Sequence, residues 1–374
     1  MHVGYGTFFQ NLGGARPDGD VWRAELELAD RAEGLGFGSV WTVEHHFGDY
    51  TMSPNPLQFL TWIAARTERV KLGSMVCVLP WHDPVRLAEE ASVLDHVSGG
   101  RLILGIGRGL ARTEFEGFRV DMAQSRQLFT ESAEAILNAF DTGTIASDGG
   151  LYVQPPTAIR PTPLSPLRGR TYASSISPES QEILARLGVG VMIFLQKPWE
   201  QTIGDVQSYA EKFREINGTE PPKPLLVIFV ACGEDRAQAA EQFEYVKAYY
   251  RSTIDHYEFD RAELAQVPGY EYYGRIAERI AKHGKDEFAT FLANLQPWGT
   301  PDAVAEGIVD CVRKVDAGGV IAVCSYGDMP REDGARNQAL FAERVLPSLL
   351  EIDTGPEIGL PPSAPADVPA SSPV

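Results

Sequence analysis

The sequence predicts an α/β fold, a TIM (β/α)8 barrel, and three observations lead to this prediction. Short runs rich in β-branched residues alternate with long helical patterns along almost the whole chain, in eight successive pairs. The length of 374 residues suits one large barrel with insertions. No G-x-G-x-x-G fingerprint follows the first predicted strand, which disfavours the alternative of an open, Rossmann-like sheet.

Predicted helices alternate with the predicted strands, as a barrel requires. The predicted strands are residues 2–9, 39–46, 70–79, 101–107, 171–176, 189–195, 225–231 and 318–325. The predicted helices are residues 20–35, 55–67, 84–97, 125–140, 178–187, 199–216, 236–250 and 301–315. Thr300 before Pro301 suits an N-cap and a first helical turn, so the last helix is expected to begin there.

Two segments interrupt this rhythm, and both are expected on the C-terminal face of the barrel, where loops act as lids. Residues 141–169 contain five prolines and are predicted to form a long loop over the barrel mouth or flank. Residues 252–298 are partly helical and rich in Tyr and Glu. Residues 353–374 are dominated by Pro, Ala and Ser, so a disordered tail is expected after a single domain of residues 1–352.

Charge and composition exclude several classes of partner. The chain carries 33 Lys+Arg against 51 Asp+Glu, a net charge of −18, which repels nucleic acids and anionic membranes. Its four cysteines show no C-x-x-C spacing, so neither a disulfide framework nor a zinc site is indicated, and a reducing cytoplasm fits best. There is no signal-peptide pattern and no apolar run near the ~18 residues of a membrane span. We therefore expect a soluble, cytoplasmic protein.

The polar residues at the ends of the strands are the candidates for chemistry, because TIM-barrel active sites lie there. The second strand ends in Glu44-His45-His46, and a single histidine that titrates near neutral pH is a good acid/base candidate. Both histidines could bind a metal, but neighbouring strand residues point to opposite faces, so no metal is expected. The alternative that both histidines only bond neighbouring loops stays open.

Two later strand ends suit an anion. The fourth strand leads into Gly107-Arg108-Gly109, where glycine allows close approach of a ligand and Arg108 offers a fixed positive charge. The fifth leads to Ser177 and Ser180 at a predicted helix start, where N–H groups and hydroxyls bind phosphate readily. A simple helix cap explains this second segment equally well.

Together these segments resemble the bacterial luciferase-like flavin monooxygenases, a TIM-barrel family, most densely over about the first 140 residues. The motifs that carry the resemblance are Trp41-Thr42-Val43-Glu44-His45-His46-Phe47 with Asn55-Pro56, Leu79-Pro80 with His82 and Pro84-Val85-Arg86, Leu94-Asp95-His96-Val97-Ser98-Gly99-Gly100-Arg101, Gly105-Ile106-Gly107-Arg108-Gly109-Leu110, and Asp121-Met122 with Ser125-Arg126.

The resemblance implies a two-component monooxygenase that uses reduced FMN, delivered by a separate flavin reductase, and O2. A flavin C4a-hydroperoxide would oxidise a small organic substrate such as an aldehyde, ketone or alkene, in a site that excludes water. The resemblance also implies a homodimer formed through the second and third helices. Gly107 stands where the luciferase catalytic subunit has a reactive cysteine, so a non-luminescent enzyme is expected.

The resemblance also assigns residues to roles. His45 matches the catalytic acid/base and Glu44 is taken as its catalytic neighbour. The wall behind the flavin ring falls at Met75–Val76, where the family often has a non-prolyl cis peptide bond. The predicted cofactor-binding residues are Met75, Val76, Gly107, Arg108, Arg126, Ser177 and Ser180, the last four as phosphate contacts.

Two other functions remain open. One is an oxidoreductase that uses the deazaflavin F420 on the same barrel and transfers hydride without oxygen. The other is a flavin-binding protein without catalysis, against which the presence of His45, Arg108 and Arg126 argues. Because no strand-to-helix turn carries a dinucleotide fingerprint, the isolated chain is not expected to oxidise NAD(P)H rapidly.

Overall fold

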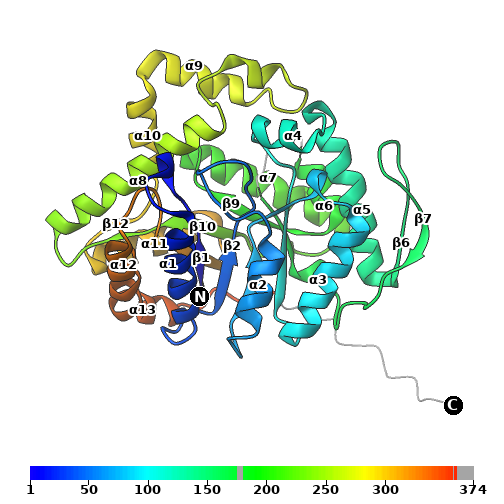
Figure 1. Ribbon diagram of the computed structural model, residues 1–374, viewed down its shortest axis with the longest axis horizontal. Coiled ribbons are helices and arrows are strands. Elements are labelled where there is room, and N and C mark those ends of the chain that lie inside the picture. Colours follow the sequence, from blue (N-terminus) through cyan, green and yellow to red (C-terminus); the bar gives the residue numbers. More distant parts are fainter. Residues whose placement is uncertain (175–179, 357, 360–374) are drawn as a thin grey trace.

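Eight parallel strands close into a barrel in the computed structural model, which describes residues 1–174, 180–356 and 358–359 (Figure 1). The TIM-barrel prediction is therefore confirmed. The barrel strands are β1 (His2–Thr7), β2 (Ser39–Thr42), β3 (Lys71–Ser74), β5 (Leu102–Gly107), β8 (Thr171–Ser174), β9 (Gly190–Phe194), β10 (Leu225–Phe229) and β13 (Gly319–Val323). Tyr5 of β1 lies opposite both Val40 of β2 and Ala322 of β13, and β3 closes the ring on β5.

A layer of helices surrounds this barrel. The helices that follow barrel strands are α1 (Asp18–Arg31), α2 (Pro56–Ala64), α3 (Pro84–Ser98), α5 (Ser125–Thr142), α6 (Gln181–Leu187), α7 (Trp199–Asn217), α8 (Arg236–His256) and α12 (Arg331–Arg344). Further helices are α4 (Arg112–Phe118), α9 (Tyr273–His283), α10 (Lys285–Ala293), α11 (Pro301–Val315) and α13 (Leu346–Leu350). The third predicted strand is divided into β3 and β4 (Cys77–Val78), and short β11 (Ala231–Cys232) pairs with β12 (Trp298–Gly299).

Local capping explains where two of these helices begin. The side chain of Asn55 accepts a hydrogen bond from the Gln58 amide at 2.9 Å, and that of Asp83 accepts one from the Arg86 amide at 3.1 Å. Each capping residue is followed by a proline, whose missing N–H costs nothing in a first turn. Thr300 also precedes a helical proline as predicted, but its side chain makes no capping hydrogen bond.

The strands are apolar on both faces, because one face lines the barrel interior and the other meets the helices. On β10, Leu225, Val227 and Phe229 pack in the interior, while Leu226 and Ile228 pack in the layer beneath the helices. Successive side chains of the strand therefore alternate between the barrel interior and the helix layer.

The prediction for residues 252–298 is confirmed in its position. The end of α8, the 3-10 helix η5 (Ala262–Gln266), α9 and α10 lie over the C-terminal ends of the strands, at the top of Figure 1 near α4. Tyr257 and Tyr273 from this segment face the same cavity as Met75 from the end of β3. This cover is the insertion that shapes the site.

The placement of residues 141–169 on the C-terminal face is wrong. The segment connects α5 to β8, and a helix-to-strand connection starts from the N-terminal side of the barrel. It contains an antiparallel hairpin, β6 (Thr144–Asp148) and β7 (Val153–Ala158), which lies along the outside of α5 (Figure 1). Glu131 of α5 accepts the amides of Leu151 and Tyr152, at 3.0 and 2.7 Å, which fixes the hairpin on the flank.

The described part of the C-terminal segment packs against the barrel. Ile358 is buried among the apolar residues of the barrel interior, and Thr354 donates a hydrogen bond to the Gly318 carbonyl at 2.9 Å. The predicted disorder therefore does not hold for these residues, because an apolar side chain there covers the barrel end. Residues 357 and 360–374 lie outside the described residues. None of the described helices is long and apolar enough to cross a membrane.

Candidate active site

A cavity opens at the C-terminal end of the barrel, between the strand ends and the 252–298 insertion. The strand ends contribute mainly apolar side chains to its walls, and the loop after β5 and the insertion contribute polar ones. Among the lining residues are Phe8, Val43, Met75, Arg108, Arg126 and Tyr257. An apolar cavity with a few convergent polar groups is the usual form of a small-molecule site.

One wall of the cavity is formed by Met75 and Val76, and the peptide bond between them is cis, as the resemblance predicted. Gly107 lies behind this wall. A Cβ atom at position 107 would come within 2.4 Å of a methyl group of Val76, so a larger residue would displace Val76. The glycine that replaces the luciferase cysteine therefore has a packing reason in this chain.

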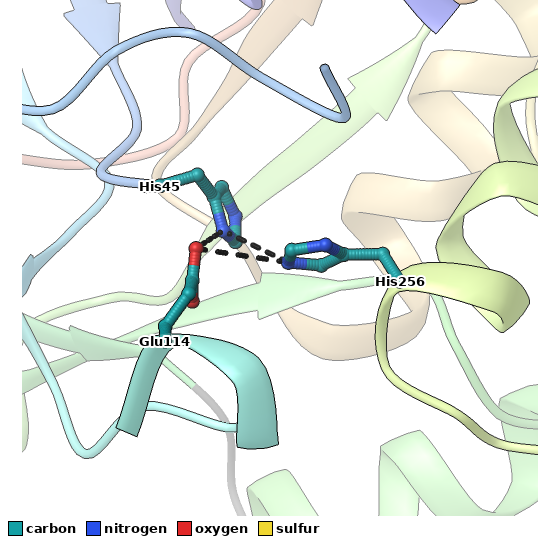
Figure 2. Close-up of side chains that lie close together, drawn as sticks. All are labelled: His45, Glu114 and His256. Carbon is teal, nitrogen blue, oxygen red and sulfur yellow. Dashed lines mark hydrogen bonds and ion pairs between the residues drawn. The ribbon is translucent and has the colours of Figure 1, made fainter. Parts of the chain in front are cut away.

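His45 lies just beyond the end of β2, where its backbone N–H donates to the Ser53 carbonyl at 3.1 Å. Its ring has three polar neighbours among the residues that the structure describes. Nδ1 is 3.0 Å from Glu114 Oε1 and 3.2 Å from His256 Nε2 (Figure 2), and Nε2 is 3.2 Å from the Tyr257 hydroxyl. We assign the proton of the neutral ring to Nδ1, because the Glu114 carboxylate only accepts. Nε2 is then the atom that is able to accept a proton.

Sequence reasoning missed all three of these neighbours, Glu114, His256 and Tyr257. Glu114 is on α4 and fully buried; its Oε1 also accepts the backbone N–H of His46 at 2.8 Å. Its Oε2 is buried and has no hydrogen-bond partner among the residues that the structure describes. An acidic residue shortly after the Gly107-Arg108 turn was a usable signal for Glu114, whereas nothing in residues 252–298 pointed to His256.

Burial lowers the pKa of His256 to about 2, and the neighbouring His45 ring acts in the same direction. The ring is therefore neutral at pH 7, so its 3.8 Å contact with Glu114 Oε1 is not an ion pair there. Tyr50 stacks on this ring with centroids 4.1 Å apart, which holds it in place.

Glu44, the other predicted catalytic residue, is bound in a different network. Its Oε1 accepts from His82 Nε2 at 2.8 Å and His46 Nε2 at 3.1 Å, and its Oε2 accepts the Val78 N–H at 2.8 Å. Burial opposes its ionisation, but these hydrogen bonds outweigh burial and lower the pKa of Glu44. Burial alone would lower the pKa of His82, but its hydrogen bond to the Glu44 carboxylate outweighs burial and raises the pKa. The adjacent histidines His45 and His46 thus serve different carboxylates.

The predicted phosphate-binding arginines come together. Arg108 and Arg126 both donate to the carbonyl oxygen of Gly269, at 3.0 and 3.4 Å, and Arg108 also lies 3.9 Å over the Tyr270 ring. Two guanidinium groups that converge on one oxygen form a site suited to a phosphate. Ser180 lines the same cavity, whereas Ser177 lies outside the described residues.

The sequence is similar to those of known monooxygenases. The family described as luciferase-like monooxygenase matches residues 1–317. The alkanal monooxygenase alpha chain of Aliivibrio fischeri is 28% identical over 333 residues, 86% of this chain and 91% of that protein. The oxygenase component of the flavin-dependent trigonelline monooxygenase of Acinetobacter baylyi is 30% identical over 240 residues, 61% of this chain and 66% of that protein.

Solved structures with this fold include enzymes of two kinds. The monooxygenase RslO1 of Streptomyces bottropensis superposes with a TM-score of 0.78 at 26% identity, covering 93% of this chain and all of that one. The oxygenating constituent of 3,6-diketocamphane monooxygenase from Pseudomonas putida, solved with FMN, gives 0.70 at 18% identity over 93% and 98% of the two chains. An F420-dependent secondary alcohol dehydrogenase gives 0.66 at 15% over 92% and 98%. At these last two identities, the similarity shows the fold alone.

Proposed function

The chain belongs to the luciferase-like monooxygenase family, and from this premise we propose that it is an FMN-dependent monooxygenase that works with a separate flavin reductase. Its substrate would be a small organic molecule such as an aldehyde, ketone or alkene. The observation that carries the proposal is the meeting, in one cavity, of the Met75–Val76 wall, the two convergent arginines and His45. The flavin-dependent relative supports the choice of a flavin.

The residues of the cavity fit FMN by their chemistry. Arg108 and Arg126 would hold the phosphate, with Ser180 close by, and Met75 and Val76 would face the ring. When bound, reduced FMN supplies the electrons with which O2 is activated and one oxygen atom is delivered to the substrate. Phe8, Val43 and Met75 keep the surroundings apolar, which limits the access of water.

His45 is the proposed acid/base. Glu114 holds a proton on Nδ1, so the ring stays in the tautomer whose Nε2 carries a lone pair. Nε2, which the Tyr257 hydroxyl contacts at 3.2 Å, is the atom that takes and returns a proton during oxidation of the substrate. Glu114 and Tyr257 orient the ring and are positioning residues in this scheme.

The experiment is to bind reduced FMN to the protein without oxygen, add O2, and follow the flavin absorbance. We expect oxidised FMN to reappear far more slowly than from free reduced FMN, because the cavity delays its unproductive oxidation. Reappearance at the rate of free flavin would contradict the proposal. Product that carries label from 18O2 would establish the oxygen transfer.

An F420-dependent oxidoreductase is the second candidate, because F420-dependent enzymes share this barrel. Parallel titrations with FMN and F420 separate the two. Tight binding of F420, together with turnover that is indifferent to O2, would favour the second candidate over the first.

We also propose that the protein is a homodimer that associates through α2 and α3. Trp62 on α2 and Val93 and Val97 on α3 are 38%, 44% and 51% exposed, so these helices present apolar side chains that a partner copy would cover. Sedimentation of the protein at micromolar concentration tests this, and a monomer at all concentrations would contradict it.

A further inference from the structure

The cluster of His45, Glu114 and His256 has a geometry that its hydrogen bonds do not explain well. Nδ1 of His45 faces both Glu114 Oε1 and His256 Nε2, at 3.0 and 3.2 Å. A single proton on Nδ1 serves only one of these two acceptors with good geometry, and without that proton the contact with the carboxylate is repulsive. The three atoms converge from β2's end, α4 and the end of α8 (Figure 2).

The distances fit the ligands of one ion. A tetrahedral zinc ion with ligands 2.0–2.1 Å away sets those ligands about 3.3 Å apart. The three donor atoms here are 3.0, 3.2 and 3.8 Å apart, which brackets that value, and all are within 4.8 Å of one another. Two imidazoles and one carboxylate are a common ligand set for zinc and related ions.

The surroundings supply the outer partners that a metal site needs. Ligating histidines usually donate their second ring N–H to a neighbouring acceptor, and Tyr257 lies 3.2 Å from Nε2 of His45. The His46 amide orients Glu114 Oε1, and Oε2 of the same carboxylate is buried without a partner among the described residues. A carboxylate that is fully buried with one oxygen unpartnered is costly, and a cation bound to it offsets that cost.

We propose that His45, Glu114 and His256 bind a divalent transition-metal ion of the zinc type, with two nitrogen ligands, one oxygen ligand and one open position. The expectation that this chain holds no metal rested on the pair His45 and His46, of which the second ring is engaged by Glu44. In the folded chain the second histidine beside His45 is His256 instead of His46, although it is 211 residues away from His45 along the chain.

An ion in this position has a chemical consequence for the cavity. It takes the place of the proton on Nδ1, and a metal-bound imidazole that keeps its proton on Nε2 no longer accepts one there. Metal binding therefore switches off the acid/base group, so micromolar Zn²⁺ should inhibit turnover. Only this inhibition rests on the proposed monooxygenase function, whereas metal binding itself is measured without flavin or substrate.

The test uses the full chain, treated with a chelator and freed of it, and titrated with Co²⁺. We expect one Co²⁺ per chain with the intense visible absorption of a tetrahedral site, and its displacement by one equivalent of Zn²⁺. If Co²⁺ binding is not saturable at one per chain, or gives only the weak absorption of an octahedral ion, the proposal is wrong and the cluster is a hydrogen-bonded one.

Variants identify the ligands. Glu114→Gln and His256→Gln should each weaken Zn²⁺ binding by at least about 100-fold, and Tyr257→Phe, which removes an outer partner, by about tenfold. The matched control is His283→Gln, which removes an exposed histidine 3.3 Å from Glu287 and should leave the affinity unchanged. Wild-type affinity in Glu114→Gln or His256→Gln, or a loss in the control alone, would overturn the assignment. If a ligand variant fails to fold, the Co²⁺ titration of the wild type and the Zn²⁺ affinity of Tyr257→Phe still test the proposal, because Tyr257→Phe removes no buried charge.

Discussion

Two buried carboxylates, Glu44 and Glu114, lie at the same end of the barrel and each contacts histidine side chains, yet they are bound in very different ways. Both oxygens of Glu44 accept hydrogen bonds, from His46, His82 and the Val78 amide. Glu114 has all its contacts on Oε1, and its Oε2 has no partner among the described residues.

The difference shows how a carboxylate with a structural role can be told from one with a functional role when both are buried glutamates. The carboxylate of Glu44, which has hydrogen bonds on both oxygens, ties the end of β2 to the segment around β4. The carboxylate of Glu114 holds His45 in the cavity through Oε1, and its Oε2 has no partner among the described residues. Saturation of the acceptor, rather than burial or sequence position, distinguishes the two.

The sharpest test compares the two histidines that these carboxylates hold. His45→Ala should leave reduced FMN bound but lower the product yield by about 100-fold or more, the scale of a lost general acid or base. His46→Ala should be milder, because its ring bonds Glu44 instead. The measurement is product yield together with flavin affinity. If both variants are equally impaired, or His46→Ala is the worse one, the two networks are not divided as described.

The second test exchanges the carboxylates themselves. Glu44→Gln should lower the free energy of unfolding by about 2–3 kcal/mol, because it removes a charged acceptor of three hydrogen bonds. Glu114→Gln should cost less, about 1 kcal/mol, because one oxygen makes no bond to lose. Urea unfolding of both variants measures the difference. Equal losses would mean that Glu114 is as much an anchor as Glu44.

The third test concerns an arginine across the cavity, which we assign, like Glu114, to function and not to stability. Arg126→Ala should weaken reduced FMN binding by roughly ten- to a hundredfold, because a charge-assisted contact with phosphate is lost. Riboflavin, which has no phosphate, should bind as before. The control is Arg279→Ala, which removes an exposed arginine of α9. An equal loss for FMN and riboflavin would assign Arg126 to the ring or to the fold.

A third buried carboxylate, Glu25 on α1, has a raised pKa, whereas the pKa of Glu44 is lowered. Burial raises its pKa from 4.5 to about 7, although the Ser325 hydroxyl donates to Oε1 at 2.6 Å and lowers it in part. Its contribution to stability is complete below pH 4.5 and is lost as the pH rises to about 7, because the unfolded chain ionises first.

Measured against Glu25→Gln, the wild type should therefore lose stability between pH 4.5 and 7, by at most about 1.4 kcal/mol per pH unit, and the difference should be constant above that range. Denaturant unfolding at a series of pH values checks this. A pH-independent difference would mean that Glu25 has its ordinary pKa in the folded protein.

Much of the fold and part of the site could be predicted from local sequence. The β/α rhythm, the apolar strands and the proline-led helices depend on residues close together in the chain, so their patterns are legible without a structure. The resemblance also located the cis bond at Met75–Val76, and it grouped Arg108 with Arg126, which both donate to the Gly269 carbonyl. These arginines follow the same strand, so the rim that they share is set by the order of the elements.

The partners of His45 were decided only by the tertiary structure. Glu114 is 69 residues from His45 and His256 is 211, and no period or motif links positions so far apart. The same holds for Glu44, whose sequence position beside His45 suggested a shared role, while the turn of the chain after β2 directs its carboxylate to His82 and Val78. A sequence determines which groups are available at the strand ends. Which of them meet depends on closure of the barrel and on how the insertion packs over it, because those contacts form only when distant segments are buried together.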